Sequence, residues 1–285
     1  MFWNVLVNEN TKIIRRRLFW VEIALIALIV LGILIALYIT VETNRNGSGL
    51  PSEERLMLLK TITWPDAWVN VLRLIGWDGF GPLFLIVLVG AATAQEYTWR
   101  TLHLWLSRGV SRPVLAIAKL TALFLAAMLV VLAALGTGGI AIAIFSIKIN
   151  GSLYLEQLDL PNLLFSILRT TFTLLPYGAL TFLLAVASRS TVVAISGGLV
   201  YALMLENLMM QFAGLLGERL SQMTQYLPGP LSNSLLALNN ATLGTASSTE
   251  MSLVTPLYAA IGIGAWTLLF VCASLWIFQR QDLAE

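Results

Sequence analysis

The chain has 285 residues, of which 58% are hydrophobic and only 11% are charged, and its formal net charge is +2. Soluble domains carry about 25% charged residues, so a water-soluble core cannot account for this much apolar surface. The long apolar runs predict an all-α polytopic membrane protein. A charge this small, without a block of like charges, excludes nucleic-acid binding. Cys272 is the only cysteine, which excludes an intrachain disulfide or a thiolate metal cluster.

Six apolar runs predict transmembrane helices, because about 20 apolar residues are needed to cross a hydrocarbon layer of about 30 Å. Together they form one transmembrane domain over residues 1–285, with outer loops at 42–79 and 214–254. The second run is the shortest. The third is the longest, and its Gly136, Gly138 and Gly139 allow either a bend or the close approach of a neighbouring helix. The six runs are about 18–41, 80–95, 114–147, 164–187, 190–213 and 255–278.

The distribution of basic residues predicts the orientation of these spans, because Lys and Arg near span ends stay preferentially in the cytoplasm. With the N-terminus inside, ten Lys and Arg residues fall on the cytoplasmic side. Seven fall outside, spread over much longer loops. We therefore expect a multi-pass protein of the cell membrane with both termini in the cytoplasm. The inner ten are Lys12, Arg15, Arg16, Arg17, Arg100, Arg108, Arg112, Lys119, Arg189 and Arg280.

Residues 1–17 predict an amphipathic helix before the first span. Phe2, Trp3 and Leu6 gather on one side with the apolar residues at 13–14, while Lys12 and the following arginines gather elsewhere. This pattern is typical of a helix lying in the inner membrane interface. The alternative is a frayed tail that precedes the first span.

The loop from Ala94 to Pro113 predicts a second amphipathic helix at the inner membrane surface. At helical period, one face is polar and the other is apolar. The alternative is a plain connecting helix with a solvated polar face. The polar face carries Glu96, Arg100, His103 and Ser107, and the apolar face carries Trp99, Leu102, Trp105 and Leu106.

This loop resembles the signature of type-2 permeases of ATP-binding-cassette (ABC) transporters. That signature has an acidic residue, a Gly-Thr-Leu element, Leu-Ser, Ser-Arg and a Lys on the next helix. The likeness is tight over 95–119 and loose over the rest of the chain. Arg100 stands where the family usually has Gly, which leaves the local backbone shape open. The matching positions are Glu96, Thr101-Leu102, Leu106-Ser107, Ser111-Arg112 and Lys119.

The resemblance implies a permease subunit of an ABC exporter. In that family the segment is a coupling helix, which docks with the N-terminal helix onto a separate ATPase subunit. Two permease copies, identical or homologous, would pair with two ATPase subunits, because six spans are too few for a two-halved pathway. ATP and Mg would bind the partner, and no cofactor is expected in this chain. The implied coupling residues are Glu96, Arg100, Thr101, His103, Ser107, Arg108, Ser111 and Arg112.

Ionisable residues inside spans are rare and favour functional sites. Glu22 lies close to the inner interface, so we expect snorkelling or a local ion pair. Arg169 and Glu206 lie 20 and 16 residues from the tight turn at 188–190, on adjacent antiparallel spans. At 1.5 Å per residue their depths agree to about one helical turn, which predicts one ion pair near the outer surface. The alternative is two independent snorkelling groups.

The same region supplies a candidate substrate path at the outer end of the spans. Pro176 would kink the fourth span there and free backbone carbonyls for polar partners. The predicted path would suit a lipid, a peptide or an amphiphilic drug. Its residues are Arg169, Thr170, Thr173, Tyr177, Tyr201 and Glu206. For the following outer loop we predict a helix over 215–226, a turn at 227–230 and a flexible polar tail.

No catalytic or metal site is expected, so the chain is not predicted to be an enzyme. It has no Gly-x-x-x-x-Gly-Lys-Ser/Thr loop for ATP phosphates, and its single histidine excludes a His-Glu-x-x-His zinc site. An ion-gradient-driven secondary transporter stays open, although neither an internal repeat nor midplane charge supports it. A non-transporting anchor or immunity subunit also stays open.

Overall fold

The computed structural model describes residues 2–46, 59–99, 105, 109–151, 159–243 and 254–281. These residues form helices joined by turns, and no strand occurs among them, so the described fold is all-α. The elements are α1 (Phe2–Arg15), α2 (Arg17–Asn46), α4 (Ala67–Ile75), α5 (Gly81–Thr98), α7 (Arg112–Asn150), α8 (Leu160–Ser188), α9 (Thr191–Val200), the π-helix η2 (Tyr201–Leu205), α10 (Glu206–Leu216), α11 (Glu218–Thr224), α12 (Pro228–Leu243) and α13 (Pro256–Arg280).

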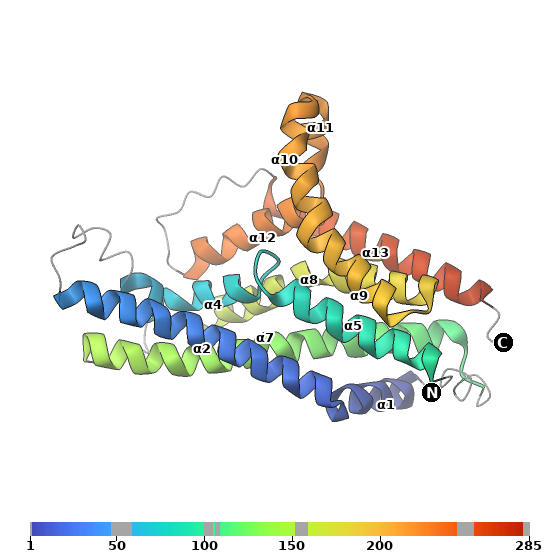
Figure 1. Ribbon diagram of the computed structural model, residues 1–285, viewed down its shortest axis with the longest axis horizontal. Coiled ribbons are helices and arrows are strands. Elements are labelled where there is room, and N and C mark those ends of the chain that lie inside the picture. The colour runs from blue at the N-terminus through green and yellow to red at the C-terminus, as the bar shows by residue number, and fades with distance from the viewer. Residues whose placement is uncertain are drawn as a thin grey trace.

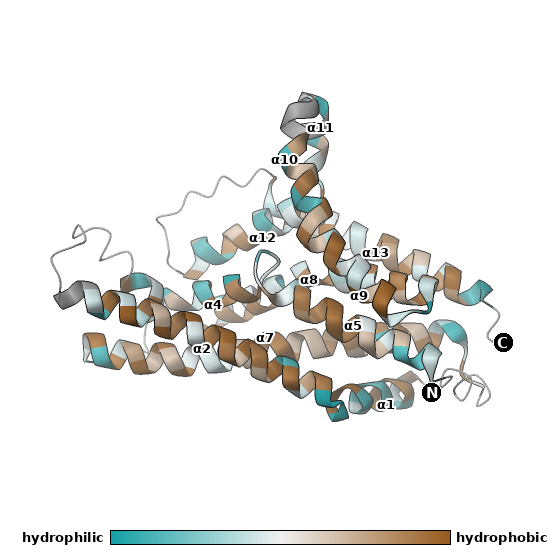
Figure 2. Ribbon diagram, viewed as in Figure 1, coloured by the Kyte–Doolittle hydropathy of each residue, from teal (hydrophilic) through white to brown (hydrophobic). Residues whose placement is uncertain are grey.

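Five of the described helices are long and apolar enough to cross a membrane, which makes the chain a multi-pass membrane protein. The run predicted at 80–95 forms α5, which is not among the five because its C-terminal turn is polar and contains Gln95 and Glu96. Figure 2 shows hydrophobic residues along the middle of the long helices and hydrophilic ones at their ends. The five segments are Arg17–Thr43, Arg112–Ile149, Leu160–Ser188, Thr191–Phe212 and Pro256–Arg280.

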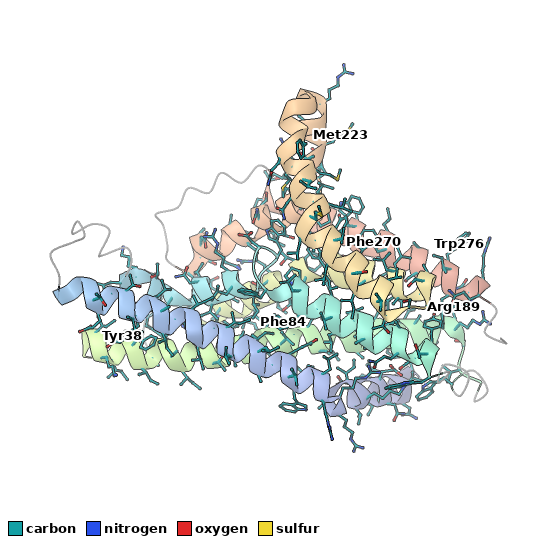
Figure 3. The ribbon with its side chains drawn as sticks, in the orientation of Figure 1. Tyr38, Phe84, Arg189, Met223, Phe270 and Trp276 are labelled. Carbon is teal, nitrogen blue, oxygen red and sulfur yellow. The ribbon has the colours of Figure 1, made fainter. Side chains whose placement is uncertain are left out.

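Both chain termini lie at the same end of the helical bundle (Figure 1). We call this the basic end, defined by Arg16, Arg112, Arg189 and Arg280. Arg112 donates hydrogen bonds to the backbone carbonyls of Phe278 and Gln279 at the end of α13 and of Gln281 directly after it, with distances of 2.7 to 3.3 Å. Figure 3 shows Arg189 at this end and Tyr38 of α2 at the other. The other end, where α2 and α7 finish, is called the opposite end.

Close helix approach at the opposite end depends on two glycines of α7. A Cβ added to Gly138 would lie 2.7 Å from the side chain of Val71 on α4, and one on Gly139 would collide with the ring of Trp68. The sequence allowed either a bend of α7 or the close approach of a neighbouring helix at these glycines, and the structure shows the close approach of α4.

The helix formed by α9, η2 and α10 leaves the bundle, and α11 lies at its far tip (Figure 1). Met223 marks this tip in Figure 3. The departure follows the π-turn at Tyr201–Leu205, and single π-turns re-aim a helix because one extra residue is inserted into its ladder. Large apolar side chains are exposed on this protruding helix, including those of Leu203, Met204 and Phe212.

The flexible tail predicted after residue 230 is wrong as far as Leu243, because these residues form α12. Leu231 and Leu235 pack against Ala259 and Ile263 of α13. The small polar residues that suggested a loop are accommodated inside the helix. Ser234, for example, donates to the carbonyl of Pro230 at 3.1 Å. The predicted turn at 227–230 is therefore the N-terminus of a buried helix.

Candidate functional site

The basic end contains a buried network of four charged side chains from three helices. Lys119 of α7 lies 2.9 Å from the Glu9 carboxylate of α1 and 2.8 Å from the Glu96 carboxylate of α5. Lys12 of α1 lies 2.6 Å from Glu9 and 3.4 Å from Glu96. Each lysine therefore contacts both carboxylates, and the network joins the N-terminal helix to the helices on either side of the predicted coupling segment.

Burial makes this network a strong constraint on the helices that carry it. Only 5% of the Lys119 side chain, 2% of Glu9 and 4% of Glu96 are exposed. Two carboxylates face two ammonium groups, so the network is electrically neutral. Removing one partner from a buried ion pair leaves an uncompensated charge and costs about 3–5 kcal/mol. The three helices are thus held in one arrangement.

Glu9 was not predicted as a member of this site, although the sequence carries a signal for it. Val5, Glu9 and Ile13 lie four residues apart and are all buried, so Glu9 occupies the apolar face of α1. A charge in that position requires a counter-charge on the neighbouring helix. Burial alone would raise the pKa of Glu9, but the charges of Lys119 and Lys12 outweigh it and hold the pKa below its usual value.

The junction between α1 and α2 attaches to the start of the predicted coupling segment. Arg16 donates to the carbonyl of Ala91 at 3.2 Å and to the Gln95 side chain at 2.9 Å, and it lies over the ring of Trp99. Lys12 lies 4.9 Å from the ring centroid of Trp105. The N-terminal helix and the residues around the segment therefore share charge-assisted and cation–π contacts.

Five of the predicted coupling residues lie outside the described residues: Arg100, Thr101, His103, Ser107 and Arg108. Ser111 precedes the first residue of α7 and makes no side-chain cap there. Arg112 was predicted to face a partner protein. In the structure its guanidinium donates instead to backbone carbonyls at the end of α13. Glu96 faces Lys119 inside the protein and is 3% exposed, so it does not present a surface to a partner.

A second feature of the basic end was missed, namely the side chain of Gln281. Its amide donates to the carbonyl of Val186 at 2.6 Å and accepts from the Tyr97 hydroxyl at 3.3 Å. With Arg112, it ties the end of α13 to α5, α7 and α8. A single glutamine after an apolar run gives no sequence signal for such a role.

Glu206 forms the centre of a second buried polar cluster, away from the basic end. It is 1% exposed, and its carboxylate accepts a hydrogen bond from the Tyr177 hydroxyl at 2.8 Å and another from the backbone N–H of Gly229. Gly229 is the second residue of α12, so the carboxylate caps the N-terminus of that helix. Free N–H groups and the helix dipole favour a negative charge at this place.

Arg169 has a different partner from the one predicted. Its guanidinium donates to the Asn239 side chain at 3.1 Å, and Asn239 donates to Thr170 at 3.3 Å. Thr173 donates to the backbone carbonyl of Thr170 at 2.8 Å. Within the described part of the chain, Arg169 and Glu206 form no ion pair. The depth count assumed two straight antiparallel spans, whereas α10 leaves the bundle and brings Glu206 level with Tyr177, about 12 Å along α8 from Arg169.

The predicted path residues form a packed polar interior in this structure. Thr170 and Thr173 are 0% exposed and Tyr177 is 1% exposed, while Tyr201 lies with its ring centroid 6.4 Å from that of Tyr177. The predicted path residues thus form two clusters along α8, one of Arg169 and Thr170 with Asn239 and one of Tyr177, Tyr201 and Glu206. Helix α12, which the sequence did not predict, supplies Gly229 as a partner of Glu206 and Asn239 as a partner of Arg169 and Thr170.

Glu22 does not behave as predicted. It is 3% exposed, and neither carboxylate oxygen has a hydrogen-bond partner among the described residues. The expected snorkelling or local ion pair is therefore wrong. Glu22 lies on the buried face of α2, together with Phe19, Ile26 and Val30, so its side chain does not reach the membrane surface.

The chain matches one family model over residues 67–284, and that model is described as a protein of unknown function, DUF2705. The chain belongs to this family. The matched range of the DUF2705 family includes Glu96, Lys119, Tyr177 and Glu206, whereas Glu9 and Lys12 precede it. No curated protein matches the chain.

Proposed function

We propose that this chain is the membrane-spanning permease subunit of an ATP-driven exporter of the ABC type-2 class, coupled to a separate ATPase subunit. One observation carries the proposal. Glu96 and Lys119, the first and last positions of the resembled signature, are paired at 2.8 Å, and Glu9 of the N-terminal helix joins them. The two elements expected to dock on an ATPase are thus fixed to one transmembrane helix.

The network would act as a rigid coupling between the ATPase and the spans. A partner bound to α1 and to residues 100–111 would displace α1 and α5 together with α7, because separating them exposes buried charges to an apolar surrounding. With 39 residues, α7 is about 58 Å long. A displacement of its basic end would therefore reach α4, which packs on Gly138 and Gly139 near the other end.

The cluster around Glu206 would close the substrate path partway along α8, because Tyr177 lies about 16 Å from the basic end of that helix. Glu206 joins α10, α8 and the N-terminus of α12 through Tyr177 and Gly229. Separating α10 from α12 would expose these polar groups together with the predicted path residues Arg169, Thr170, Thr173 and Tyr201. Substrate would then leave between α8, α10 and α12.

The proposal includes a sixth span and an orientation. Helix α5 crosses the membrane although its last turn is polar. The polar side chains of that turn, Gln95 and Glu96, contact Arg16 and Lys119 instead of lipid. The basic end faces the cytoplasm, with both termini there. Two such chains assemble with two ATPase subunits, which bind ATP and Mg.

Affinity purification of the tagged chain from the membranes of its native host tests this function. We expect an ATPase chain with a phosphate-binding loop to co-purify and to hydrolyse ATP in a vanadate-sensitive manner. Double charge reversal, Arg100→Glu with Arg108→Glu, should reduce its recovery several-fold, whereas Arg219→Glu on α11 should not. If no ATPase is recovered, or transport follows an ion gradient without ATP, the proposal fails.

A further inference from the structure

The junction between α1 and α2, residues 14–20, carries three consecutive arginines in two different environments. The middle one, Arg16, faces α5 and donates to the Gln95 side chain at 2.9 Å. Arg15 and Arg17, on either side of it, are exposed. Neither of these two guanidiniums has an ion-pair partner among the residues that the structure describes. The junction therefore presents two positive charges at the surface.

A hydrogen bond between the two helices fixes the shape of the junction. The indole N–H of Trp20, in the first turn of α2, donates to the backbone carbonyl of Ile14, in the last turn of α1, at 2.8 Å. Arg15 and Arg17 are two residues apart, so their Cα atoms are separated by about 7 Å at most. Both long side chains can therefore reach the same anionic group.

The junction lies at the level of lipid headgroups. Arg17 is the first residue of the apolar segment Arg17–Thr43, and the junction belongs to the end of the bundle where both termini lie (Figure 1). Exposed apolar side chains follow Arg17 along one face of α2, namely Val21, Leu25 and Leu28. At 1.5 Å per residue the first two lie about 6 and 12 Å from Arg17, which is within one leaflet of a hydrocarbon layer of about 30 Å.

We propose that this junction binds an anionic membrane phospholipid, of the phosphatidylglycerol class. Its phosphate accepts hydrogen bonds from Arg15 and Arg17, and one acyl chain lies along Val21 and Leu25. The ring of Trp20, which is 59% exposed, lies at the boundary between headgroup and acyl chain, where tryptophan is favoured. The site requires only that α2 spans the membrane, so it does not depend on the proposed transport function.

The charges of the junction also predict which lipids bind less well. Residues 14–20 contain no carboxylate, and the first carboxylate of α2, Glu22, is buried and faces the protein. A zwitterionic headgroup would place its cation beside Arg15 and Arg17 with no anion to receive it. Each arginine near an anionic membrane surface raises affinity about fivefold. Glycerol phosphate, which has no acyl chains, loses the contact with the apolar face of α2.

Native mass spectrometry of the purified full-length chain, with any partner that co-purifies, tests this site. Separate titrations would use phosphatidylglycerol, phosphatidylcholine and glycerol phosphate. We expect phosphatidylglycerol to bind at least about tenfold more tightly than either of the others, because two arginines contribute. Arg15→Gln with Arg17→Gln should remove this preference and leave phosphatidylcholine binding unchanged.

Lys148→Gln with Arg219→Gln is the matched control, because it removes two exposed positive charges that lie away from the junction, on α7 and α11. It should leave the preference for phosphatidylglycerol intact. An equal loss of preference in the two double variants would overturn the site, since the lipid would then respond only to the net charge of the chain. Equal binding of glycerol phosphate would also overturn it, since the junction would then be a phosphate site rather than a lipid site.

Fluorescence quenching tests the position of the bound lipid independently. Phosphatidylglycerol with brominated acyl chains should quench the emission of Trp20, measured as the difference between the wild type and Trp20→Phe. This difference should disappear in Arg15→Gln with Arg17→Gln. Quenching of Trp20 that is the same with and without the two arginines would contradict the proposed site.

Discussion

Lys119 neutralises two carboxylates that are otherwise buried without a sufficient counter-charge. Replacing it by methionine keeps an unbranched side chain without the charge, and it leaves Glu9 and Glu96 facing each other with only the more exposed Lys12 between them. We expect Lys119→Met to lower the free energy of unfolding by about 3–5 kcal/mol. Unfolding in mixed micelles with increasing denaturing detergent would measure this loss.

Lys148→Met is the matched control for this substitution, because Lys148 is an exposed lysine of the same helix. It should change the free energy of unfolding by less than about 1 kcal/mol. Equal effects of the two substitutions would show that the buried network contributes nothing particular to stability.

Glu9 gives the network a dependence on pH. Its pKa in the folded protein is lowered, chiefly because Lys119 and Lys12 outweigh the opposing effect of burial. The stabilisation is therefore complete above the pKa of the unfolded chain, about 4.3, and is lost as the pH falls through the lower folded value. We expect α1 to stay docked from about pH 7 to pH 5 and to loosen only as the pH falls below about 4.3 toward the lower folded pKa of Glu9.

A spin label at Val7, which is 49% exposed on α1, would report this loosening. The label requires Val7→Cys in a Cys272→Ser background. Its mobility should rise only in acid, whereas Glu9→Gln should raise it already at neutral pH. An acid-induced rise that is identical in Glu9→Gln would assign the effect to another group.

At the residue level, the sequence predicted the type of side chain better than its partner. Glu96 and Lys119 were both singled out, but their pairing was not. Glu9 on α1 and Asn239 on α12 were missed, although each lies four residues from buried apolar neighbours on its own helix. A polar residue inside an apolar stripe indicates a buried contact, and this signal was present. The identity of the partner is determined by tertiary packing, which one sequence does not contain.

The N-terminus of α12 fits closely against the Trp77 ring and against Glu206 of α10. A Cβ added to Gly229 would lie 2.6 Å from the Trp77 ring and 2.9 Å from the Glu206 carboxylate. Gly229→Ala should therefore displace α12 from α10 and cost about 1–3 kcal/mol, the usual penalty of overpacking. The same detergent unfolding measurement applies.

Gly136→Ala is the control, because nothing lies within 4 Å of a Cβ at this helical position of α7. It should leave stability unchanged or raise it by up to about 1 kcal/mol, since alanine favours helix over glycine. If both alanine variants were equally stable, α12 would not be seated on Glu206 as described.

At the level of elements, hydropathy predicted the long helices. It did not predict the helix that is buried against other helices rather than against lipid. The helices α2, α7, α8 and α13 begin and end within a few residues of the predicted runs, because lipid selects a continuous apolar stretch. Helix α12 is buried by α8 and α13 instead, so its Asn and Ser residues were read as a loop. The π-turn before Glu206 leaves no sequence signal, and because α10 leaves the bundle after this turn, the depth count behind the predicted Arg169 ion pair does not apply.

At the level of the whole molecule, the arrangement predicts which parts are accessible from each side of the membrane. The two termini share the basic end (Figure 1), and Lys148 lies near the far end of α7. In a Cys272→Ser background, Lys148→Cys should react with a membrane-impermeant thiol reagent in intact cells. Arg280→Cys should react only after the cells are opened. The reverse pattern would invert the proposed orientation.

The most direct test of the central claim measures ATP hydrolysis by the co-purified complex when the network is altered. Glu96→Gln keeps the shape of the side chain and removes its charge, so it loosens α5 from Lys119 without creating a cavity. If the network couples the ATPase to the spans, complex recovery should stay near the wild-type level while vanadate-sensitive hydrolysis no longer responds to substrate. Hydrolysis that responds as in the wild type would contradict the account.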